Sequence, residues 1–355
     1  MKKWFFYFLK LIGILVLIFI GFIVYITIFD YRPDNVEPLG VRAGKSQVLK
    51  LEKDTFSLLT WNIGYAGLGA EMDFFYDKGH KVRPSKTMGR KYLDGIKSFL
   101  GRQDSVDFFV LQEIDKNARR SHHFNEVEEI LDLMKDDYGV FAKNYHCQFV
   151  PVPWYSPLGY VKGGMLTFSE YPIAEATRYA YPLIASWPDK LFLLDRCFIL
   201  TRFHLANGKD LLLLNTHNSA YVTDRLLRIK ELRIIKDKML EEYKKGNYVI
   251  AGGDWNANPP GFNPENGFNG HKSFKSVVKM NKNTMPAGWT WAFDNKAPTN
   301  RQNYKAFVKG ENPTTVIDYF VVSPNIELLM AKNIDLNFEN SDHNPCYVKL
   351  RLIND

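Results

Sequence analysis

The chain has 355 residues, of which 46% are apolar, which is enough for one large domain or two small ones. Its formal net charge is +7; the first 30 residues carry +2 of this and the rest +5, without the block of Lys and Arg that is typical of nucleic-acid-binding segments. Three cysteines, far apart in the sequence, exclude a disulfide scaffold.

The N-terminal segment has the pattern of a membrane anchor. Residues 11–29 form an uncharged, apolar run whose helical length is roughly 28 Å, close to the thickness of a bilayer core. Because the apolar character begins earlier, we expect a transmembrane helix over residues 5–29. Lysines precede it and acidic residues follow it, so the positive-inside rule predicts a single-pass cell-membrane protein with a cytoplasmic N-terminus and the rest of the chain outside. The alternative is a cleaved signal peptide, whose apolar region should be shorter.

Residues 30–52 are polar and carry proline and glycine, so we expect a tether before a domain at 53–355. Strand-like runs are predicted at 56–62, 107–111, 163–168, 198–204, 211–215, 248–251, 316–322 and 347–352. Helices are predicted from a Ser85 cap to about Leu100, from Asn125 to Met134 and from Asp224 to Tyr243, whereas residues 65–84 and 141–160 show no clear element. Several successive strands have no helix between them, which favours two packed sheets with helices outside.

A short motif, Gly252-Gly253-Asp254-Trp255-Asn256, follows the predicted strand 248–251. We expect the glycines to break the strand and allow a sharp turn, after which Asp254 and Asn256 point the same way. A carboxylate and an amide side by side suit a hard cation and a polarised water. The same spacing also makes an ordinary Asx turn, so the motif alone leaves both interpretations open.

Further polar residues lie at or near the ends of other predicted strands. They are Asn62, Glu113, Asn215, His217, Asn218, Asp318, Asp342 and His343. Each has a structural alternative as a cap, a surface residue or a hydrogen-bonded core residue. Asp318 is the hardest to explain in that way, because it lies within an apolar run, where a carboxylate needs a cationic or donor partner. The candidates for that partner are His217 and His343.

The order and local setting of these residues resemble the endonuclease/exonuclease/phosphatase superfamily, which includes the DNase I-like nucleases and the neutral sphingomyelinases. The matching segments occur in the family's order, from about residue 55 to the C-terminus: 60–62, 112–113, 215–217, 253–256, 317–319 and 341–343. The resemblance implies an α/β fold, a four-layered αββα sandwich of the DNase I type, here preceded by one transmembrane helix. It places the site at one end of the two sheets.

The resemblance also implies cleavage of a phosphate ester with Mg²⁺, or with Mn²⁺ or Ca²⁺ in its place. It implies that Glu113 binds the metal with Asn62 beside it. Asp342 completes the acidic group, either as a direct ligand or by supporting one. Asn218 and Arg196 are expected to contact the substrate.

The remaining implied roles are catalytic. His343 is the general base, and Asp318 holds it in the correct tautomer. Asp254 and Asn256 position the nucleophilic water and the phosphate, and His217 donates a hydrogen bond to a phosphate oxygen. The chemistry is consistent, because an imidazole with a pKa near neutrality can accept a proton from a water polarised by a hard cation.

The substrate is less well defined by the sequence. The Arg after the Asp-x-Asn motif and the Cys-Asp-Arg of the inositol polyphosphate phosphatases are absent here. Two segments rich in aromatics and proline, 150–155 and 286–291, are expected to flank the site, where they would suit a membrane interface or a lipid headgroup. The alternative is that they form a satellite core.

These observations leave three functions open. The first is a membrane-anchored phosphodiesterase of the sphingomyelinase or phospholipase C type, acting on a lipid headgroup outside the cytoplasm. The second is an extracytoplasmic nuclease acting on DNA or RNA. The third is a non-catalytic binding module that keeps the fold, which the intact set of polar site residues argues against.

Overall fold

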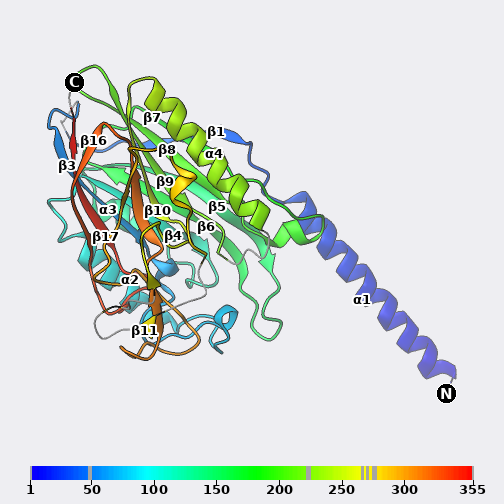
Figure 1. Ribbon diagram of the computed structural model, residues 1–355. Coiled ribbons are helices and arrows are strands. Elements are labelled where there is room, and N and C mark those ends of the chain that lie inside the picture. Colours follow the sequence, from blue (N-terminus) through cyan, green and yellow to red (C-terminus); the bar gives the residue numbers. More distant parts are fainter. Residues whose placement is uncertain are drawn as a thin grey trace.

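The computed structural model describes residues 2–46, 50–220, 225–264, 268, 272–273 and 278–353. The first element is helix α1 (Lys2–Ile28), which projects away from the rest of the protein (Figure 1). Its segment Lys3–Ile28 is long and apolar enough to cross a membrane, and only 6% of its most apolar stretch is buried against the protein. That exposure distinguishes α1 from the buried core helix of a soluble protein, which has the same length and composition.

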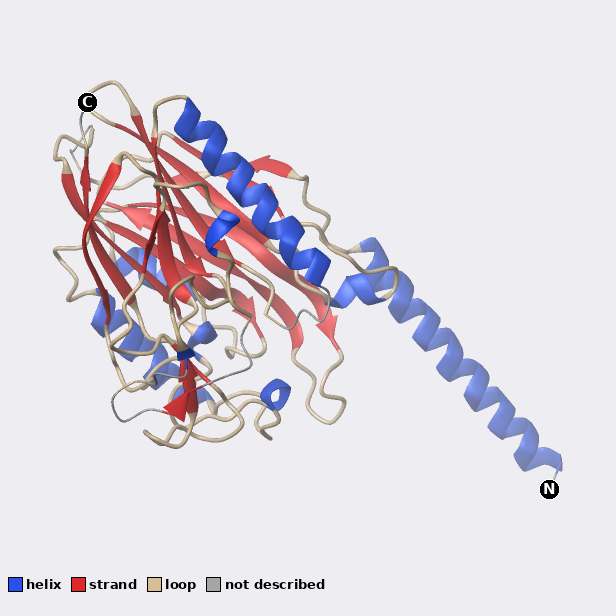
Figure 2. Cartoon of the chain, in the orientation of Figure 1, coloured by secondary structure: helices blue, strands red, loops and turns tan. Residues whose placement is uncertain are grey.

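Two seven-stranded sheets form the centre of the domain (Figure 2). The first sheet has the spatial order β1 (Val36–Pro38), β7 (Glu175–Ala180), β8 (Cys197–His204), β9 (Asp210–His217), β10 (Tyr248–Asp254), β15 (Asp318–Val322) and β12 (Thr290–Ala292). The second has the order β16 (Ile326–Asn333), β17 (Cys346–Leu352), β3 (Thr55–Asn62), β4 (Phe108–Ala118), β6 (Gly159–Ser169), β5 (Tyr138–Val150) and β2 (Val41–Arg42). A small sheet contains β11 (Lys272–Ser273), β14 (Pro313–Thr315) and β13 (Asn300–Arg301).

Three α-helices cover the outer faces of the two large sheets: α2 (Lys86–Leu100), α3 (Glu126–Leu133) and α4 (Arg225–Lys244). Short 3₁₀ helices lie in the loops: η1 (Gly64–Ala66), η2 (Phe75–Asp77), η3 (Asp189–Phe192) and η5 (Lys282–Thr284). One core lies between the sheets, a second packs α2 and α3 on the second sheet, and a third packs α4 on the first sheet. The predicted four-layered αββα sandwich is therefore confirmed.

The helix boundaries follow local sequence signals. Ser85 Oγ accepts a hydrogen bond from Met88 N at 3.2 Å at the start of α2, and the Asn125 side chain accepts one from Glu128 N at the start of α3. Both starts agree with the predictions. For α4 the predicted first residue, Asp224, lies outside the described residues. The three cysteines are buried free thiols.

Two segments differ from the predictions because their structure depends on distant partners. Residues 30–52, expected to form a tether, contribute β1, which pairs with β7, and β2, which pairs with β5. Residues 141–160, which show no clear pattern, form most of β5 and the turn to β6, a long antiparallel pair. The chain that follows α1 is therefore attached to the edges of both sheets.

The glycines of the 252–256 motif also act differently from the prediction. They do not break β10, which continues to Asp254. A Cβ at Gly253, whose φ is +146°, would lie 2.0 Å from the carbonyl oxygen of Thr216, and one at Gly252 would lie 2.2 Å from the Phe320 ring. The glycines therefore allow β9 and the Phe320 ring to approach β10 closely at the end of the strand.

Candidate active site

The polar residues predicted from the sequence converge where the central strands of the two sheets end. Each large sheet has one parallel pair near its centre: β3 with β4, and β9 with β10. Because parallel strands present their carboxyl ends at the same edge, Asn62 lies beside Gln112, and His217 lies beside Asp254. The facing packing of the two sheets brings these ends together.

His343 and Asp318 form a buried hydrogen-bonded pair. His343 Nδ1 donates to Asp318 Oδ2 at 2.9 Å, and the Asn300 amide lies 3.0 Å from His343 Nε2. Although burial alone lowers the pKa of His343, the carboxylates of Asp318 and Asp254 raise it to about 10. The sequence predicts Asp318 in the interior of the strand 316–322, but Asp318 is the first residue of β15. Its side chain therefore leaves the sheet at the edge that faces His343.

Asn62 connects the acidic residues of the two sheets. Its Nδ2 donates to Glu113 Oε1 at 3.1 Å and to Asp254 Oδ2 at 3.0 Å. Burial, with the nearby Asp342, raises the pKa of Glu113, and burial, with the nearby Asp318, raises the pKa of Asp254 to about 6. These raised pKa values mean that the carboxylates are crowded and lack enough positive charge.

Asp342 is held against the same end of β3. Its Oδ2 accepts a hydrogen bond from Asn303 Nδ2 at 2.6 Å, and a Cβ at Gly64 would lie only 2.9 Å from its Oδ1. Gly64 N in turn donates to Asn62 Oδ1 at 3.0 Å. Gly64, at φ +54°, lets the backbone fit between Asn62 and Asp342.

Glu113 lies inside β4 and not at its end, in contrast to the prediction. The register between β4 and β6 shifts between Leu111 and Ile114, and Glu113 has a φ of +49°. This bulge turns the Glu113 side chain out of the ladder and leaves it 26% exposed, the most open of the clustered carboxylates. Strain of this kind is common next to active sites.

The donor set fits a divalent cation. Glu113, Asp254 and Asp342 supply carboxylate oxygen atoms, which are the ligands of Mg²⁺, Mn²⁺ and Ca²⁺, and no cysteine takes part. The Asn62 carboxamide directs its nitrogen at Glu113 and Asp254, and its oxygen accepts from Gly64 N. Asp254, Asp318 and His343 also offer one ligand atom each within 4.8 Å of one another, but the last two are already paired with each other. The crowding of carboxylates is therefore clearest at Glu113 and Asp254, whose pKa values are raised, and the nearby Asp342 contributes to it at Glu113.

His217 faces this acidic group. Its Nε2 lies 3.7 Å from Glu113 Oε1 and 3.6 Å from Asp254 Oδ2, and its Nδ1 is buried without a hydrogen-bond partner. Burial and the nearby Arg196 lower its pKa well below the usual value, so the ring is neutral. A neutral imidazole carries one N–H and can donate it to a ligand.

Three further predicted residues surround His217. Asn256, at φ +48°, donates from its backbone N to Asp254 Oδ1 and from Nδ2 to the carbonyl of Asn218. The Asn218 side chain is fully buried and bonded to Thr216 and to a carboxylate of α4. Arg196 Nη1 donates to the carbonyls of His217 and Asn218. Asn218 and Arg196 thus support the backbone at the site, and their substrate contacts stay predictions.

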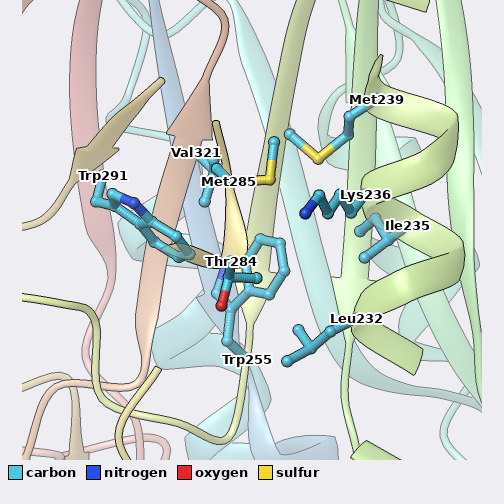
Figure 3. Close-up of a pocket in the computed structure, with 9 residues that line it drawn as sticks. All are labelled: Leu232, Ile235, Lys236, Met239, Trp255, Thr284, Met285, Trp291 and Val321. Atoms are coloured by element: carbon cyan, nitrogen blue, oxygen red, sulfur yellow. The ribbon is translucent and has the colours of Figure 1, made fainter. Parts of the chain in front are cut away.

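Trp255 fixes the end of β10 from the outer side. Its indole stacks on Tyr319 at 5.5 Å and donates to the Tyr319 carbonyl at 3.0 Å. Figure 3 shows Trp255, Met285 and Trp291 facing the side chains of α4. Trp289 is also buried there, so the two tryptophans of residues 286–291 pack in the core between α4 and the first sheet and do not rim the site. By contrast, Trp154 in segment 150–155 is 85% exposed.

Sequence reasoning missed several residues that hold the site. Asn300, which begins β13, contacts His343, and Asn303, in the loop after β13, contacts Asp342; neither lies in a recognisable motif. Arg120 pairs with Asp115 at 2.9 Å, and its guanidinium lies over the Tyr65 ring at 3.9 Å from the ring centre. The two asparagines, Asn300 and Asn303, were the only signal in the sequence for these contacts, because buried amides often orient the acidic residues that bind metals.

Comparison with known proteins agrees with this geometry. The sequence profile of the endonuclease/exonuclease/phosphatase family matches residues 59–343, and the chain belongs to that family. Members of the family are hydrolases acting on phosphate ester bonds, most of them dependent on a divalent metal, and this protein is a hydrolase of that class. No curated protein matches the sequence.

Solved structures show the same fold at low sequence identity. An endonuclease/exonuclease/phosphatase from Beutenbergia cavernae has 17% identity and a TM-score of 0.56 over 84% of this chain and 72% of its own. D. rerio TDP2, solved with a single-strand DNA product, has 15% identity and a TM-score of 0.53 over 84% of this chain and 100% of its own. The human Nocturnin catalytic domain, solved with bound sulfate, has 16% identity and a TM-score of 0.52 over 88% of this chain and 100% of its own.

Proposed function

We propose that the protein is a membrane-anchored, divalent-metal-dependent phosphodiesterase that hydrolyses a lipid headgroup, in the manner of a sphingomyelinase or phospholipase C. The observation that carries the chemistry is the His343–Asp318 pair, 2.9 Å apart, beside the crowded carboxylates Glu113, Asp254 and Asp342. Residues 5–29 are proposed to span the cell membrane with the N-terminus in the cytoplasm, and the catalytic domain to lie outside.

Glu113 and Asp342 would hold the cation, with Asp254 beside them. Asn62 would join them with its carboxamide turned over, so that Oδ1 and not Nδ2 faces Glu113 and Asp254. When bound, the cation lowers the pKa of a coordinated water and offsets charge on the carboxylates and the phosphoryl oxygens. Mg²⁺ is the first choice because the donors are oxygen atoms, and Mn²⁺ or Ca²⁺ would fit the same donors.

The chain's own residues would perform the proton transfer and the positioning. His343 is oriented through Nδ1 by Asp318, and the positive charge of a bound cation would lower its raised pKa towards neutrality, so that the imidazole can take the proton of the attacking water. The water oxygen bonds to phosphorus while the bond from phosphorus to the lipid oxygen breaks. The lipid oxygen takes up a proton from solvent and leaves as an alcohol, and the headgroup leaves as a phosphomonoester. Asp254 and Asn256 position the water and the phosphate. His217, buried and neutral, donates its N–H to a phosphoryl oxygen as negative charge develops there.

A nuclease is the second candidate, and it is favoured by the single-strand DNA product seen with D. rerio TDP2. A nuclease needs a strongly basic cleft, and its binding should fall steeply with ionic strength. The lipid substrate is favoured here because α1 would keep the enzyme at its own bilayer, which raises the effective concentration of membrane-linked substrates.

The experiment compares the full-length protein and its His343→Ala variant, in Mg²⁺ and in EDTA, on two substrates. These are vesicles with phosphocholine headgroups and supercoiled plasmid. We expect release of phosphocholine that requires both Mg²⁺ and His343, with the plasmid left intact. Nicking of the plasmid without phosphocholine release would establish the nuclease instead. No hydrolysis of these or of an aryl phosphodiester would favour a binding module.

A further inference from the structure

Two loops carry exposed apolar side chains next to the membrane helix. One is the turn 151–158 between β5 and β6, and the other is the loop 181–196 between β7 and β8. Their large apolar residues are between 38% and 85% exposed: Val152, Trp154, Tyr155, Leu183, Ile184, Trp187 and Leu193. The second loop forms an open groove. Clustered apolar exposure of this kind marks an interaction surface.

Helix α1 packs on this region through its last two turns. The Phe22 ring meets Phe149 edge to face at 5.7 Å, at the end of β5 next to the turn. Trp187 Nε1 donates to Thr27 Oγ1 at 3.1 Å. Ile26 is only 3% exposed, whereas most of the preceding helix is open. The C-terminal end of α1 and the two loops are therefore continuous, and Figure 1 shows the helix leaving the domain from this place.

Both loops lie at the end of the sheets that carries the site. In the second sheet, Val161 after the turn pairs with Ala118, beyond Glu113 along β4. In the first sheet, Phe198 after the loop pairs with Thr216, next to His217. The loop 181–196 even reaches the site directly, since Arg196 at its end holds the His217 carbonyl.

From this arrangement we propose that the turn 151–158 and the loop 181–196 form a bilayer-docking surface, which rests in the headgroup layer of the membrane that α1 spans. Trp187 is hydrogen-bonded to Thr27 near the end of the apolar helix, which is the level of the membrane interface. Trp and Tyr are the residues that prefer this level. The surface holds the mouth of the site against the headgroups. This proposal requires that α1 spans the membrane, but it does not require that the protein hydrolyses a phosphodiester.

The bilayer is favoured over a protein partner because the surface continues the helix that would be embedded in lipid. A protein bound to these two loops would have to compete for the same surface with the lipid headgroups around α1. The exposed side chains are also apolar and aromatic, which suits insertion of about 5–10 Å into the boundary between headgroups and acyl chains.

The test uses the full-length protein in phosphatidylcholine nanodiscs, with EDTA present so that no headgroup is cleaved. The native cysteines are buried, so a cysteine introduced at the surface can be labelled alone with an environment-sensitive fluorophore. The test positions are Trp154→Cys and Leu193→Cys. The matched control is Leu329→Cys on β16, at the opposite edge of the second sheet, where Leu329 is 40% exposed against 43% for Leu193.

We expect lipids spin-labelled near the head of the acyl chain to quench the labels at 154 and 193 and to leave the label at 329 unquenched. The depth should be about 5–10 Å below the phosphates. If the labels at 154 and 193 are quenched no more than the label at 329, the docking surface is disproved. Because no turnover is measured, this result leaves the phosphodiesterase proposal untouched, and failure of that proposal leaves this result standing.

Discussion

The substitution Asp318→Asn tests the role of the buried pair most sharply. Asp318 is fully buried and accepts the Nδ1–H of His343 at 2.9 Å. Raising the pKa of His343 from 6.5 to about 10 corresponds to roughly 5 kcal/mol of preference for the imidazolium. Asp318 is the largest contributor among the carboxylates that raise it. A hydrogen bond to a charged group contributes about 1.5–3 kcal/mol, so the loss of the Asp318 carboxylate should remove about that much stabilisation of the imidazolium.

Because about 1.4 kcal/mol corresponds to a tenfold change in rate, we expect kcat to fall by about 10- to 100-fold. The assay is hydrolysis of an aryl phosphodiester at saturating Mg²⁺, which avoids any dependence on lipid. Loss of the carboxylate lowers the pKa of His343, so the acidic limb of the kcat profile should move to lower pH.

Asp107→Asn is the control for structural damage. Asp107 is also buried, and it accepts a hydrogen bond from Ser57 N at 2.7 Å. It directly precedes the first residue of β4, at the end of the strand that lies away from the site. This variant should lose stability while kcat keeps its order of magnitude. Wild-type kcat in a folded Asp318→Asn protein, or an equal loss in Asp107→Asn, would refute the proposed role of Asp318.

Three further predictions follow from the same contacts. His217→Ala should lower kcat by about 10²- to 10³-fold, the usual effect of removing one donor to a developing oxyanion, measured with the aryl phosphodiester. Asn303→Ala removes the 2.6 Å hydrogen bond to Asp342, so the Mg²⁺ concentration for half-maximal activity should rise about 10- to 100-fold, as for other groups that orient metal ligands. Burial and the nearby Asp115 raise the pKa of Glu126 well above its usual value. The stability that protonated Glu126 contributes is therefore present at low pH and is lost as the pH rises, by up to about 1.4 kcal/mol per pH unit. Glu126→Gln should flatten this decline in the free energy of unfolding, measured by denaturant titration between pH 5 and 8.

Control variants are available for the first two of these predictions. His204→Ala changes a half-exposed histidine far from the acidic group and should leave kcat unchanged. Asn312→Ala removes a buried amide of the same loop that bonds only to backbone N–H and C=O groups, so the Mg²⁺ requirement should stay constant. An unchanged Mg²⁺ requirement in Asn303→Ala, or a Glu126→Gln protein as sensitive to pH as the wild type, would contradict the corresponding prediction.

Local signals in the sequence predicted what depends on neighbouring residues. The Ser85 and Asn125 caps and the apolar spacing behind them define α2 and α3. The central strands were visible as apolar runs, because a strand buried on both faces needs little information beyond its own residues. The motif order then placed Asn62, His217, Asp254 and His343 at one edge.

Features that depend on distant partners could not be predicted in this way. β1 and β2, with three and two residues, are too short to show a strand pattern, and only their pairing with β7 and β5 makes them strands. The bulge that exposes Glu113 arises from a mismatch with β6, which no local pattern reveals. The close approach of β9 to Gly253, which explains the glycine, likewise requires the position of the neighbouring strand.

The central claim is that the carboxylates around Glu113 hold a divalent cation that is needed for phosphodiester hydrolysis. The most direct measurement is the rate of aryl phosphodiester hydrolysis as a function of Mg²⁺ concentration, for the full-length protein and for Glu113→Gln. We predict no activity in EDTA, saturation with Mg²⁺ for the wild type, and a strongly raised Mg²⁺ requirement for the variant. Full activity in EDTA, or an identical Mg²⁺ dependence for the two proteins, would contradict the account.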